Sequence, residues 1–317
     1  MKQGWEKKKL PDVLWFQEGP GVRKHQYVSE GIKLLNVANL VNGKLDLSTS
    51  DRYISIDEAY GKYKHFLVDE GDLILASSGI QVEYIEKKMG FVQKEHLPLC
   101  MNTSTIRFKT LNKNVLNIEY FMYFLKSYEF KRQLFSLITG CAQLNYGPSH
   151  LKQMVVPVPP IAEQEKIVAE LDCLSGIIEK KKQQLKELDN LAQSIFYEMF
   201  GDPVENDKGW EVKKLGDVCA LKAGKAIKAN ELSDVASDNL YPCFGGNGIR
   251  GYIEKVSHHD QYPIIGRQGA LCGNVVLSTK EFYATEHAVV VQPVVEMNIY
   301  WSYYTLMYMN LNRLAQG

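Results

Sequence analysis

The feature that most restricts the fold of this 317-residue chain is a proline-rich strip that runs straight into a long helix-favouring segment. The strip reads VPVPP at residues 156–160, and its prolines favour extended backbone up to Ile161. The next proline is Pro203, which follows Gly201 and indicates a helix end at Phe200. We therefore predict one helix over residues 161–200, which at a rise of 1.5 Å per residue is about 60 Å long and exceeds what one small domain needs.

Apolar residues recur every three or four positions along this helix, and Lys181 is the one charged residue among them. Because this spacing keeps them on one side of the helix for about four heptads, it is typical of a coiled-coil seam that requires a partner helix. The alternative is a single long helix that lies on the surface of a domain. The residues of the seam are Leu171, Leu174, Ile178, Leu185, Leu188, Ala192, Ile195 and Met199.

The segments before and after the helix repeat each other in the same order. The matching pairs are GWEKKKL with GWEVKKL (residues 4–10 and 209–215), GDLILASSG with QYPIIGRQG (71–79 and 261–269), NIEYF with NIYWS (117–121 and 298–302) and LITG with LAQG (137–140 and 314–317). Each half shows short strand-like runs with Gly, Asn and Pro turns, and then one helix of roughly 20 residues.

This repeat defines the expected fold class, which is α+β with two similar domains separated by a long coiled-coil-type α-helix. We place the first domain at residues 1–155 and the second at residues 203–317. The proline strip and the spacer helix occupy residues 156–202 between them.

Charge and cysteine usage narrow the classes of function. The net charge is zero, with 37 basic and 37 acidic residues, and residues 1–160 carry 21 basic against 16 acidic side chains. A protein that binds nucleic acid through charge alone would be more basic, so DNA contact must rest on local patches or on partner subunits. Six scattered cysteines without a CxxC pair predict reduced thiols, a cytoplasmic location and no metal. No apolar run is long enough for a bilayer, so no membrane contact is expected.

Four motifs carry a resemblance to a known family. They are VPVPPIAEQEKI at residues 156–167, LDNLAQSIF at 188–196, YPCFGGNGIRGYI at 241–253 and IGRQGALCGNV at 265–275. Together with the repeat, they make essentially the whole chain resemble the DNA-specificity subunits of type I restriction-modification systems. The resemblance implies two target-recognition domains that each read one half of a split double-stranded DNA target. It also implies that the helix sets their separation and docks DNA methyltransferase (modification) subunits, that a restriction/translocase subunit joins, and that the chain has no catalytic residues and no cofactor.

One departure from the family pattern concerns the long helix. Family members usually carry a second copy of it after the second domain, packed antiparallel on the first copy. Here the sequence stops at Gly317, where the second strip would begin. We therefore expect a truncated product or fragment whose seam either forms a homodimer or is covered by partner subunits.

The glycine-rich loops supply the candidates for DNA contact, because Arg and Lys bind phosphates or guanine edges while Gln and Asn pair with adenine. The candidates in the first domain are Arg23, Lys24, Gln26, Ser77, Ser78, Gln81, Asn145 and Tyr146. Those in the second domain are Lys222, Lys225, Lys228, Asn247, Arg250, Arg267 and Gln268. Base readout by one module uses only a few side chains, so only part of this set is expected to touch DNA.

Three other functions use different parts of the sequence. GNGIRG at residues 246–251 satisfies the dinucleotide pattern GxGxxG, but a strand rather than a helix is expected after it. Asp72 with Glu86, Lys87 and Lys88 resembles the carboxylate and lysine set of metal-dependent nucleases. A coiled-coil adaptor without DNA contact would need only the long helix. Methyl transfer by the chain itself is not expected, because no Asn-Pro-Pro-aromatic or Asp-Pro-Pro-aromatic motif for an extruded adenine is present.

Overall fold

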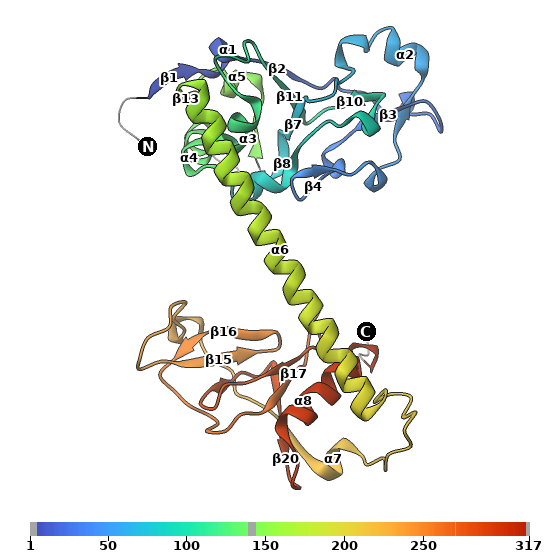
Figure 1. Ribbon diagram of the computed structural model, residues 1–317, viewed down its shortest axis with the longest axis vertical. Coiled ribbons are helices and arrows are strands. Elements are labelled where there is room, and N and C mark those ends of the chain that lie inside the picture. Colours follow the sequence, from blue (N-terminus) through green and yellow to red (C-terminus); the bar gives the residue numbers. More distant parts are fainter. Residues whose placement is uncertain (1–4, 139–143, 270, 315–317) are drawn as a thin grey trace. The chain divides into compact units, whose positions relative to one another are not determined.

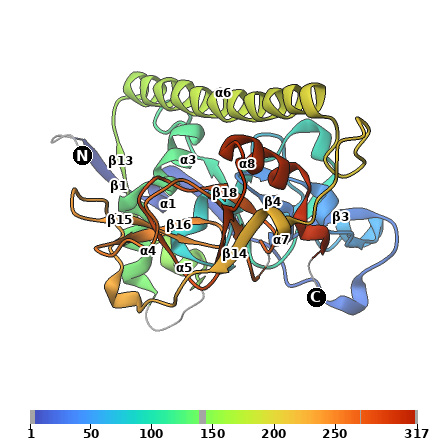
Figure 2. The same cartoon turned by 90° about the horizontal axis from the view of Figure 1, so that it is seen from below.

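The computed structural model describes residues 5–138, 144–269 and 271–314 of the chain. It divides into two compact units, Met1–Glu179 and Lys180–Gly317 (Figure 1). The dividing point lies within α6 (Ile161–Phe200), which is a continuous helix of 40 residues (Figure 2). The predicted long helix is confirmed at both ends, and so is the α+β class with two β-rich domains. The division of the chain at residues 155 and 202 stays a prediction.

The main sheet of unit 1 has four antiparallel strands in the order β2-β11-β7-β9. A short helix, α1, leads directly into β2, and Phe108 on the central strand packs against Phe16 and Phe121 with ring centroids 5.9 and 5.3 Å away. These contacts lie in the largest apolar core of the unit. The elements are α1 (Leu10–Val13), β2 (Leu14–Glu18), β7 (Leu73–Ala76), β9 (Met89–Phe91) and β11 (Thr105–Thr110).

A second sheet of unit 1 has the order β10-β3-β6, in which β3 is parallel to β10 and antiparallel to β6. Three two-stranded pairs, β1 with β13, β4 with β5 and β8 with β12, complete the strands of the unit. The bounds are β1 (Glu6–Lys9), β3 (Ile32–Leu35), β4 (Leu40–Val41), β5 (Lys44–Leu45), β6 (Tyr53–Ile54), α2 (Ile56–Tyr60), β8 (Ser78–Ile80), β10 (Leu99–Met101), β12 (Leu144–Asn145), α5 (Pro148–Leu151) and β13 (Val155–Val158).

The prediction of a single helix of roughly 20 residues near the end of each half is wrong. In unit 1 it is two helices, α3 (Ile118–Lys126) and α4 (Tyr128–Leu137), because Ser127 is extended at φ −73° and ψ 153°. The Ser127 hydroxyl accepts a hydrogen bond from the backbone N–H of Phe130 at 3.2 Å, so it begins a new helix instead of continuing the old one. In unit 2 the corresponding helix, α8 (Ile299–Tyr308), has only 10 residues.

Unit 2 repeats the topology of the two larger sheets of unit 1. Its main sheet has the order β14-β20-β17-β18, all antiparallel, and its second sheet has β15 parallel to β19 and antiparallel to β16. A short helix, α7, leads directly into β14, as α1 leads into β2. The bounds are α7 (Leu215–Val218), β14 (Cys219–Ala223), β15 (Tyr241–Gly245), β16 (Gly248–Ile253), β17 (Pro263–Gly266), β18 (Val275–Leu277), β19 (Tyr283–Ala284) and β20 (Ala288–Pro293).

The repeat extends to individual residues that have the same structural role at equivalent positions of the two units. Gly19 follows β2 and Gly224 follows β14, and a Cβ atom there would come within 2.0 Å of the Asn102 carbonyl oxygen and 1.9 Å of the Ala284 carbonyl oxygen, respectively. The side chain of Asn117 caps α3, and that of Asn298 caps α8, each by accepting two backbone N–H groups. The predicted repeat is therefore confirmed, although the pair LITG and LAQG lies partly outside the described residues.

The proline strip is fastened to unit 1 at two points. The strand β13 pairs antiparallel with β1, and the backbone N–H of Leu10 donates to the Met154 carbonyl at 3.0 Å. Four residues into α6, the side chain of Gln164 is completely buried. Its Oε1 accepts the N–H of Asn117 at 2.9 Å, while its Nε2 donates to the carbonyls of Val115 at 2.9 Å and Pro159 at 2.7 Å.

Two further sequence expectations concern the chain as a whole. The five described cysteines carry free thiols, while Cys141 lies outside the described residues. Within the ranges that the structure describes, no helix is both long and apolar enough to cross a membrane.

Candidate nucleic-acid interface

The predicted contact residues differ in how far they reach the surface. All seven candidates of unit 2 are exposed. In unit 1, Arg23, Lys24, Gln81 and Asn145 are exposed. The remaining four are not: Gln26 and Ser78 are half-buried, and Ser77 and Tyr146 are buried.

One turn occurs in both units with different side chains. It follows β7 in unit 1 and β17 in unit 2, and its first residue is Ser77 or Arg267. The N–H of Ser77 donates to the Ser104 carbonyl at 2.8 Å, and the N–H of Arg267 donates to the His287 carbonyl at 3.0 Å. Two residues later, Gly79 and Gly269 have left-handed backbone, with φ of 70° and 81°. The two segments therefore share these two backbone features and carry Ser-Ser in one unit and Arg-Gln in the other, although Ser78 begins the strand β8 and Gln268 is in no strand.

In unit 1, part of this turn is used by the fold itself. The Ser77 hydroxyl donates to the carboxylate of Glu18 at 3.2 Å, and the Tyr146 hydroxyl donates to the carbonyl of Ala76 at 2.6 Å. Complete burial raises the pKa of Tyr146 well above its usual value. The side chains of Ser77 and Tyr146 thus hold the turn in place and offer almost no surface to a ligand. Asn145 stays exposed on β12, next to β8.

In unit 2, Gly273 and Asn274 of the loop after β17 are hydrogen-bonded to Gly266 at the end of that strand. The N–H of Gly266 donates to the Asn274 carbonyl, and the N–H of Gly273 donates back to Gly266, both at 2.8 Å. The amide of Asn274 also donates to Oδ1 of Asn247 at 3.0 Å, which joins this loop to the turn between β15 and β16. Asn274 was not among the predicted residues, although it stands in the IGRQGALCGNV motif.

The close contact of these two turns explains the first glycine of GNGIRG. A Cβ atom on Gly246 would lie 3.0 Å from the His287 carbonyl oxygen and 3.2 Å from the Cα of Gly266. The strand β16 begins within the motif at Gly248 and continues to Ile253, so the chain after the motif is a strand, as expected, and not the helix that a dinucleotide site needs. Four exposed candidates, Asn247, Arg250, Arg267 and Gln268, therefore stand on or beside linked turns.

A second pair of equivalent turns carries Arg23 and Lys228. In unit 1, Oε1 of Gln26 accepts the N–H of Arg23 at 3.0 Å, and its Nε2 donates to Glu58 at 2.7 Å. In unit 2, Oε1 of Glu231 accepts the N–H of Lys228 at 3.3 Å. The amide of Gln26 is thus occupied by the fold, whereas Arg23 and Lys228 remain exposed.

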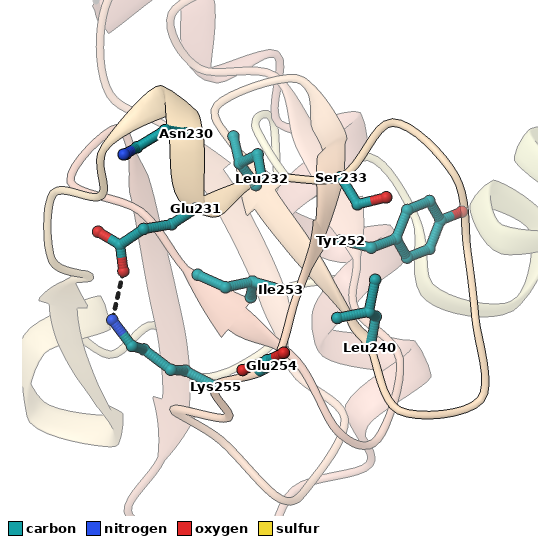
Figure 3. Close-up of a pocket in the computed structure, with 9 residues that line it drawn as sticks. All are labelled: Asn230, Glu231, Leu232, Ser233, Leu240, Tyr252, Ile253, Glu254 and Lys255. Atoms are coloured by element: carbon teal, nitrogen blue, oxygen red, sulfur yellow. Dashed lines mark hydrogen bonds and ion pairs between the residues drawn. The ribbon is translucent and has the colours of Figure 1, made fainter.

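Beside the turn in unit 2 lies a shallow hollow of about 410 Å³ between residues 230–233 and β16 (Figure 3). An ion pair of Glu231 with Lys255 closes one side of it. The hydrogen bond from Lys255 lowers the pKa of the Glu231 carboxyl. The other two lysines predicted in this unit are also exposed. Lys222 lies on β14, and Lys225 lies two residues after the end of that strand, on the way to the same turn.

The carboxylates of the nuclease alternative have other partners. Asp72 is buried and accepts hydrogen bonds from Arg107 at 3.3 Å and from the N–H of Asp69 at 2.8 Å, while burial raises the pKa of its carboxyl. Glu86 pairs separately with Lys131 at 2.8 Å. Across the described ranges of the chain, no group of three or more His, Cys, Asp and Glu side chains is placed to hold a metal ion.

The seam of α6 is open to solvent along most of its length. Every residue from 172 to 190 is exposed. Of the eight seam residues, only Leu171 and Ala192 are half-buried. The other six have exposed fractions between 47% and 63%: Leu174, Ile178, Leu185, Leu188, Ile195 and Met199.

Comparison with known proteins agrees with the repeat. Residues 2–190 and 207–317 match the family described as the type I restriction modification DNA specificity domain. The EcoprrI specificity subunit of Escherichia coli is 40% identical over 164 residues, which cover 50% of this chain and 41% of that protein. The MjaIX specificity subunit of Methanocaldococcus jannaschii is 26% identical over 247 residues, 72% of this chain and 54% of that protein. The chain therefore spans about half the length of these relatives.

Solved structures match over nearly the whole chain. The S subunit of a type I restriction-modification system from M. genitalium aligns with a TM-score of 0.54 at 17% identity and covers 98% of this chain and 78% of that one. A chain from a structure describing complex assembly of the type I system aligns with a TM-score of 0.53 at 17% identity, over 98% of this chain and 81% of that one. At this identity the likeness concerns the fold.

Proposed function

Because the chain belongs to the type I restriction-modification DNA specificity family, we propose that it reads a bipartite double-stranded DNA target, one half with each unit. The observation that carries this proposal is the segment after β7 and after β17, which starts with the same backbone hydrogen bond, has a left-handed glycine at the same place and carries two different sets of side chains. A shared scaffold with exchangeable surface residues is what two readers of different sequences require. The readers are residues 1–155 and 203–317, and α6 between them makes the spacing of the half-sites part of the target.

The partners follow from the family and from the open face of α6. DNA methyltransferase (modification) subunits and a restriction/translocase subunit would supply the catalysis, while this chain supplies recognition and no cofactor, in the cytoplasm. Its neutral net charge supports this division, because partner subunits can add the phosphate contacts that this chain lacks.

The experiment that tests recognition is DNA binding and methylation by the chain with and without modification subunits. We expect the complex to bind its target with an affinity that falls steeply with salt, since phosphate contacts release counterions. We also expect methylation only when modification subunits are present. Magnesium-dependent cleavage of DNA by the chain alone would favour the nuclease alternative. A complex whose gel shift depends neither on salt nor on DNA sequence would favour the coiled-coil adaptor.

Replacing Arg267 with Ala is expected to weaken recognition of the second half-site. A guanidinium on a closed loop can contact a guanine edge or a phosphate, and its loss costs about 1–3 kcal/mol. Titration of matched DNA duplexes with the complex measures the loss, and methylation of variant targets shows whether one base position is relaxed. Lys280→Ala is the control, because it removes the same charge from another exposed site of unit 2. Equal affinity of the two variants would contradict a role for the loop.

The open seam supports a further partner, which we propose to be a helix of a second copy or of a modification subunit. The double substitution Leu185→Glu with Leu188→Glu should abolish that association, because two charges would replace two apolar residues in the seam. Gln184→Glu adds one charge on a neighbouring polar position and should leave association unchanged. Light scattering of the chain alone and with modification subunits distinguishes the two partners. This use of the seam would be refuted if the chain alone were entirely monomeric and bound no hydrophobic dye, and if the doubly substituted chain still assembled fully with modification subunits.

A further inference from the structure

The segment between β19 and β20 lies beside Arg267, although none of its residues is among the predicted DNA contacts. The register of β17 on β20 pairs Gly266 with Ala288, so the next two residues, Arg267 and His287, stand directly opposite each other. The backbone N–H of Arg267 donates to the His287 carbonyl at 3.0 Å, which extends the ladder by this pair. In an antiparallel ladder, opposite residues project to the same face with Cβ atoms about 5 Å apart. The side chains of Arg267 and His287 are therefore neighbours.

The fold holds this segment by its backbone. Thr285 is completely buried, and its N–H donates to the Phe244 carbonyl at 3.0 Å. The turn between β15 and β16 packs on the segment as well, because a Cβ atom on Gly246 would lie 3.0 Å from the His287 carbonyl oxygen. None of these contacts uses the side chains of Glu286 and His287, which are 36% and 45% exposed. Both side chains are therefore available where the two turns that carry predicted contacts meet.

The equivalent pair in unit 1 has different chemistry. The register of β11 on β7 places Ser104 opposite Ser77, and the N–H of Ser77 donates to the Ser104 carbonyl at 2.8 Å, as in unit 2. However, the Ser77 hydroxyl donates to Glu18, and Ser104 has left-handed backbone with φ 66°. Equivalent positions thus carry two short serines in unit 1 and two long side chains with nitrogen atoms in unit 2. Such variation on a shared backbone is expected where two domains read different sequences.

The charges around the pair in unit 2 favour a base over a phosphate. The guanidinium of Arg267 is exposed, and Nε2 of His287 lies 3.2 Å from Oε1 of Glu286. Oε2 of Glu286 is buried without a hydrogen-bond partner among the described residues. The carboxylate is therefore a fixed negative charge next to the pair, which repels a DNA phosphate. A base edge has no net charge and offers donors and acceptors in the major groove, so it suits the pair better.

We propose that His287 reads a base of the second half-site together with Arg267, and that Glu286 is a positioning residue that holds the imidazole and keeps phosphates away. This inference rests on the proposed DNA recognition and adds a contact residue to it. Arg267 donates to a guanine, and His287 contacts the same or the adjacent base pair. The distances agree, because opposite Cβ atoms are about 5 Å apart and stacked base pairs are about 3.4 Å apart.

The test uses the full chain in complex with modification subunits. Its probes are DNA duplexes with the target established by methylation mapping, and duplexes with every single base-pair change in the second half of that target. We expect His287→Ala to bind the matched duplex about tenfold more weakly and to lose discrimination at one base pair. That base pair should be the same as, or adjacent to, the one relaxed by Arg267→Ala. Discrimination in the first half-site should stay unchanged.

The salt dependence of affinity distinguishes a base contact from a phosphate contact. Loss of a phosphate contact weakens all duplexes alike and reduces the salt slope by about 1. His287→Ala should keep the slope of the parent complex, because a base contact releases no counterion. Glu286→Gln keeps the size of the side chain and removes its charge. It should bind unrelated DNA about 2–5-fold more tightly at low salt and discriminate less at the base pair that His287 reads, which a purely structural role of Glu286 would not produce.

His259→Ala is the matched control. His259 is also an imidazole close to a carboxylate, since its Nδ1 lies 3.5 Å from Oε1 of Glu281. It follows the bridge of His258 with Phe282, which lies at the opposite end of β19 from the Arg267–His287 pair. The control should therefore leave both affinity and discrimination unchanged.

Four outcomes would overturn the inference: discrimination by His287→Ala equal to that of the parent, equal effects of the two histidine variants, a salt slope reduced by about 1, or relaxed base pairs more than two positions apart. If Arg267→Ala still relaxed the second half-site, DNA recognition would stand and only the role of His287 would fall. A complex that prefers no duplex over any other would overturn both.

Discussion

Exchanging residues 1–155 for the corresponding segment of another family member is expected to change the first half of the recognised DNA target and to leave the second half unchanged. The physical reason is that the apolar cores are separate. The two core clusters of the first unit contain no residue beyond Val168, and those of the second begin at Leu215. A new first domain therefore needs to reproduce the pairing of β1 with β13, the backbone groups of Asn117 and Val115 that Gln164 binds, and the apolar surface against which Val168 packs.

Methylation mapped across a genome or a plasmid library measures this exchange. Each wrong base pair costs about 1–3 kcal/mol, roughly additively, so a half-site with three changed pairs should lose at least a hundredfold in occupancy. The reciprocal exchange of residues 203–317 is the control and should alter only the second half. If the first exchange altered both halves of the target, the two units would not be independent readers.

The sequence was sufficient to predict elements whose ends are set by backbone chemistry. Pro160 keeps the residue before it extended, and Gly201 takes a left-handed backbone with φ of 79°, so the structure places the ends of α6 at Ile161 and Phe200. The repeat could be recognised in the sequence for a similar reason. The asparagines that cap α3 and α8 and the two segments that begin with Gly-Trp are short local motifs. The break at Ser127 was missed, although a Ser three residues before an apolar position is a known helix start.

The candidate interface was predicted less well, because a side chain's role depends on partners that lie far away in the chain. Gln26 has the right chemistry to read adenine, yet its amide donates to Glu58, which lies 32 residues away. Tyr146 likewise donates to Ala76, 70 residues away. Arg267 and Gln268 remain free to contact DNA, because their loop is closed by backbone hydrogen bonds that leave these side chains at the surface.

Gln164 shows the same dependence on distant partners, since its bonds reach 47 and 49 residues back in the chain to Asn117 and Val115. Its place in the VPVPPIAEQEKI motif sets it apart from the solvated glutamines of the same helix, but the sequence does not show its partners. The structure does, because Gln164 is completely buried while Gln183 is exposed and bonds only to Glu187 one turn away. The amino end of α6 is thus joined to the first unit chiefly through one carboxamide and the adjoining strand.

Replacing Gln164 with Ala is therefore expected to destabilise the first unit by about 3 kcal/mol, because one N–H and two carbonyl groups lose their buried partner. Gln183→Ala, on the exposed face of the same helix, should stay within about 0.5 kcal/mol of the parent chain. Denaturant unfolding followed by hydrogen exchange at Asn117 and along β13 measures both the loss and its location. If the two variants unfolded at the same denaturant concentration, the buried carboxamide would not be what holds the helix to the domain.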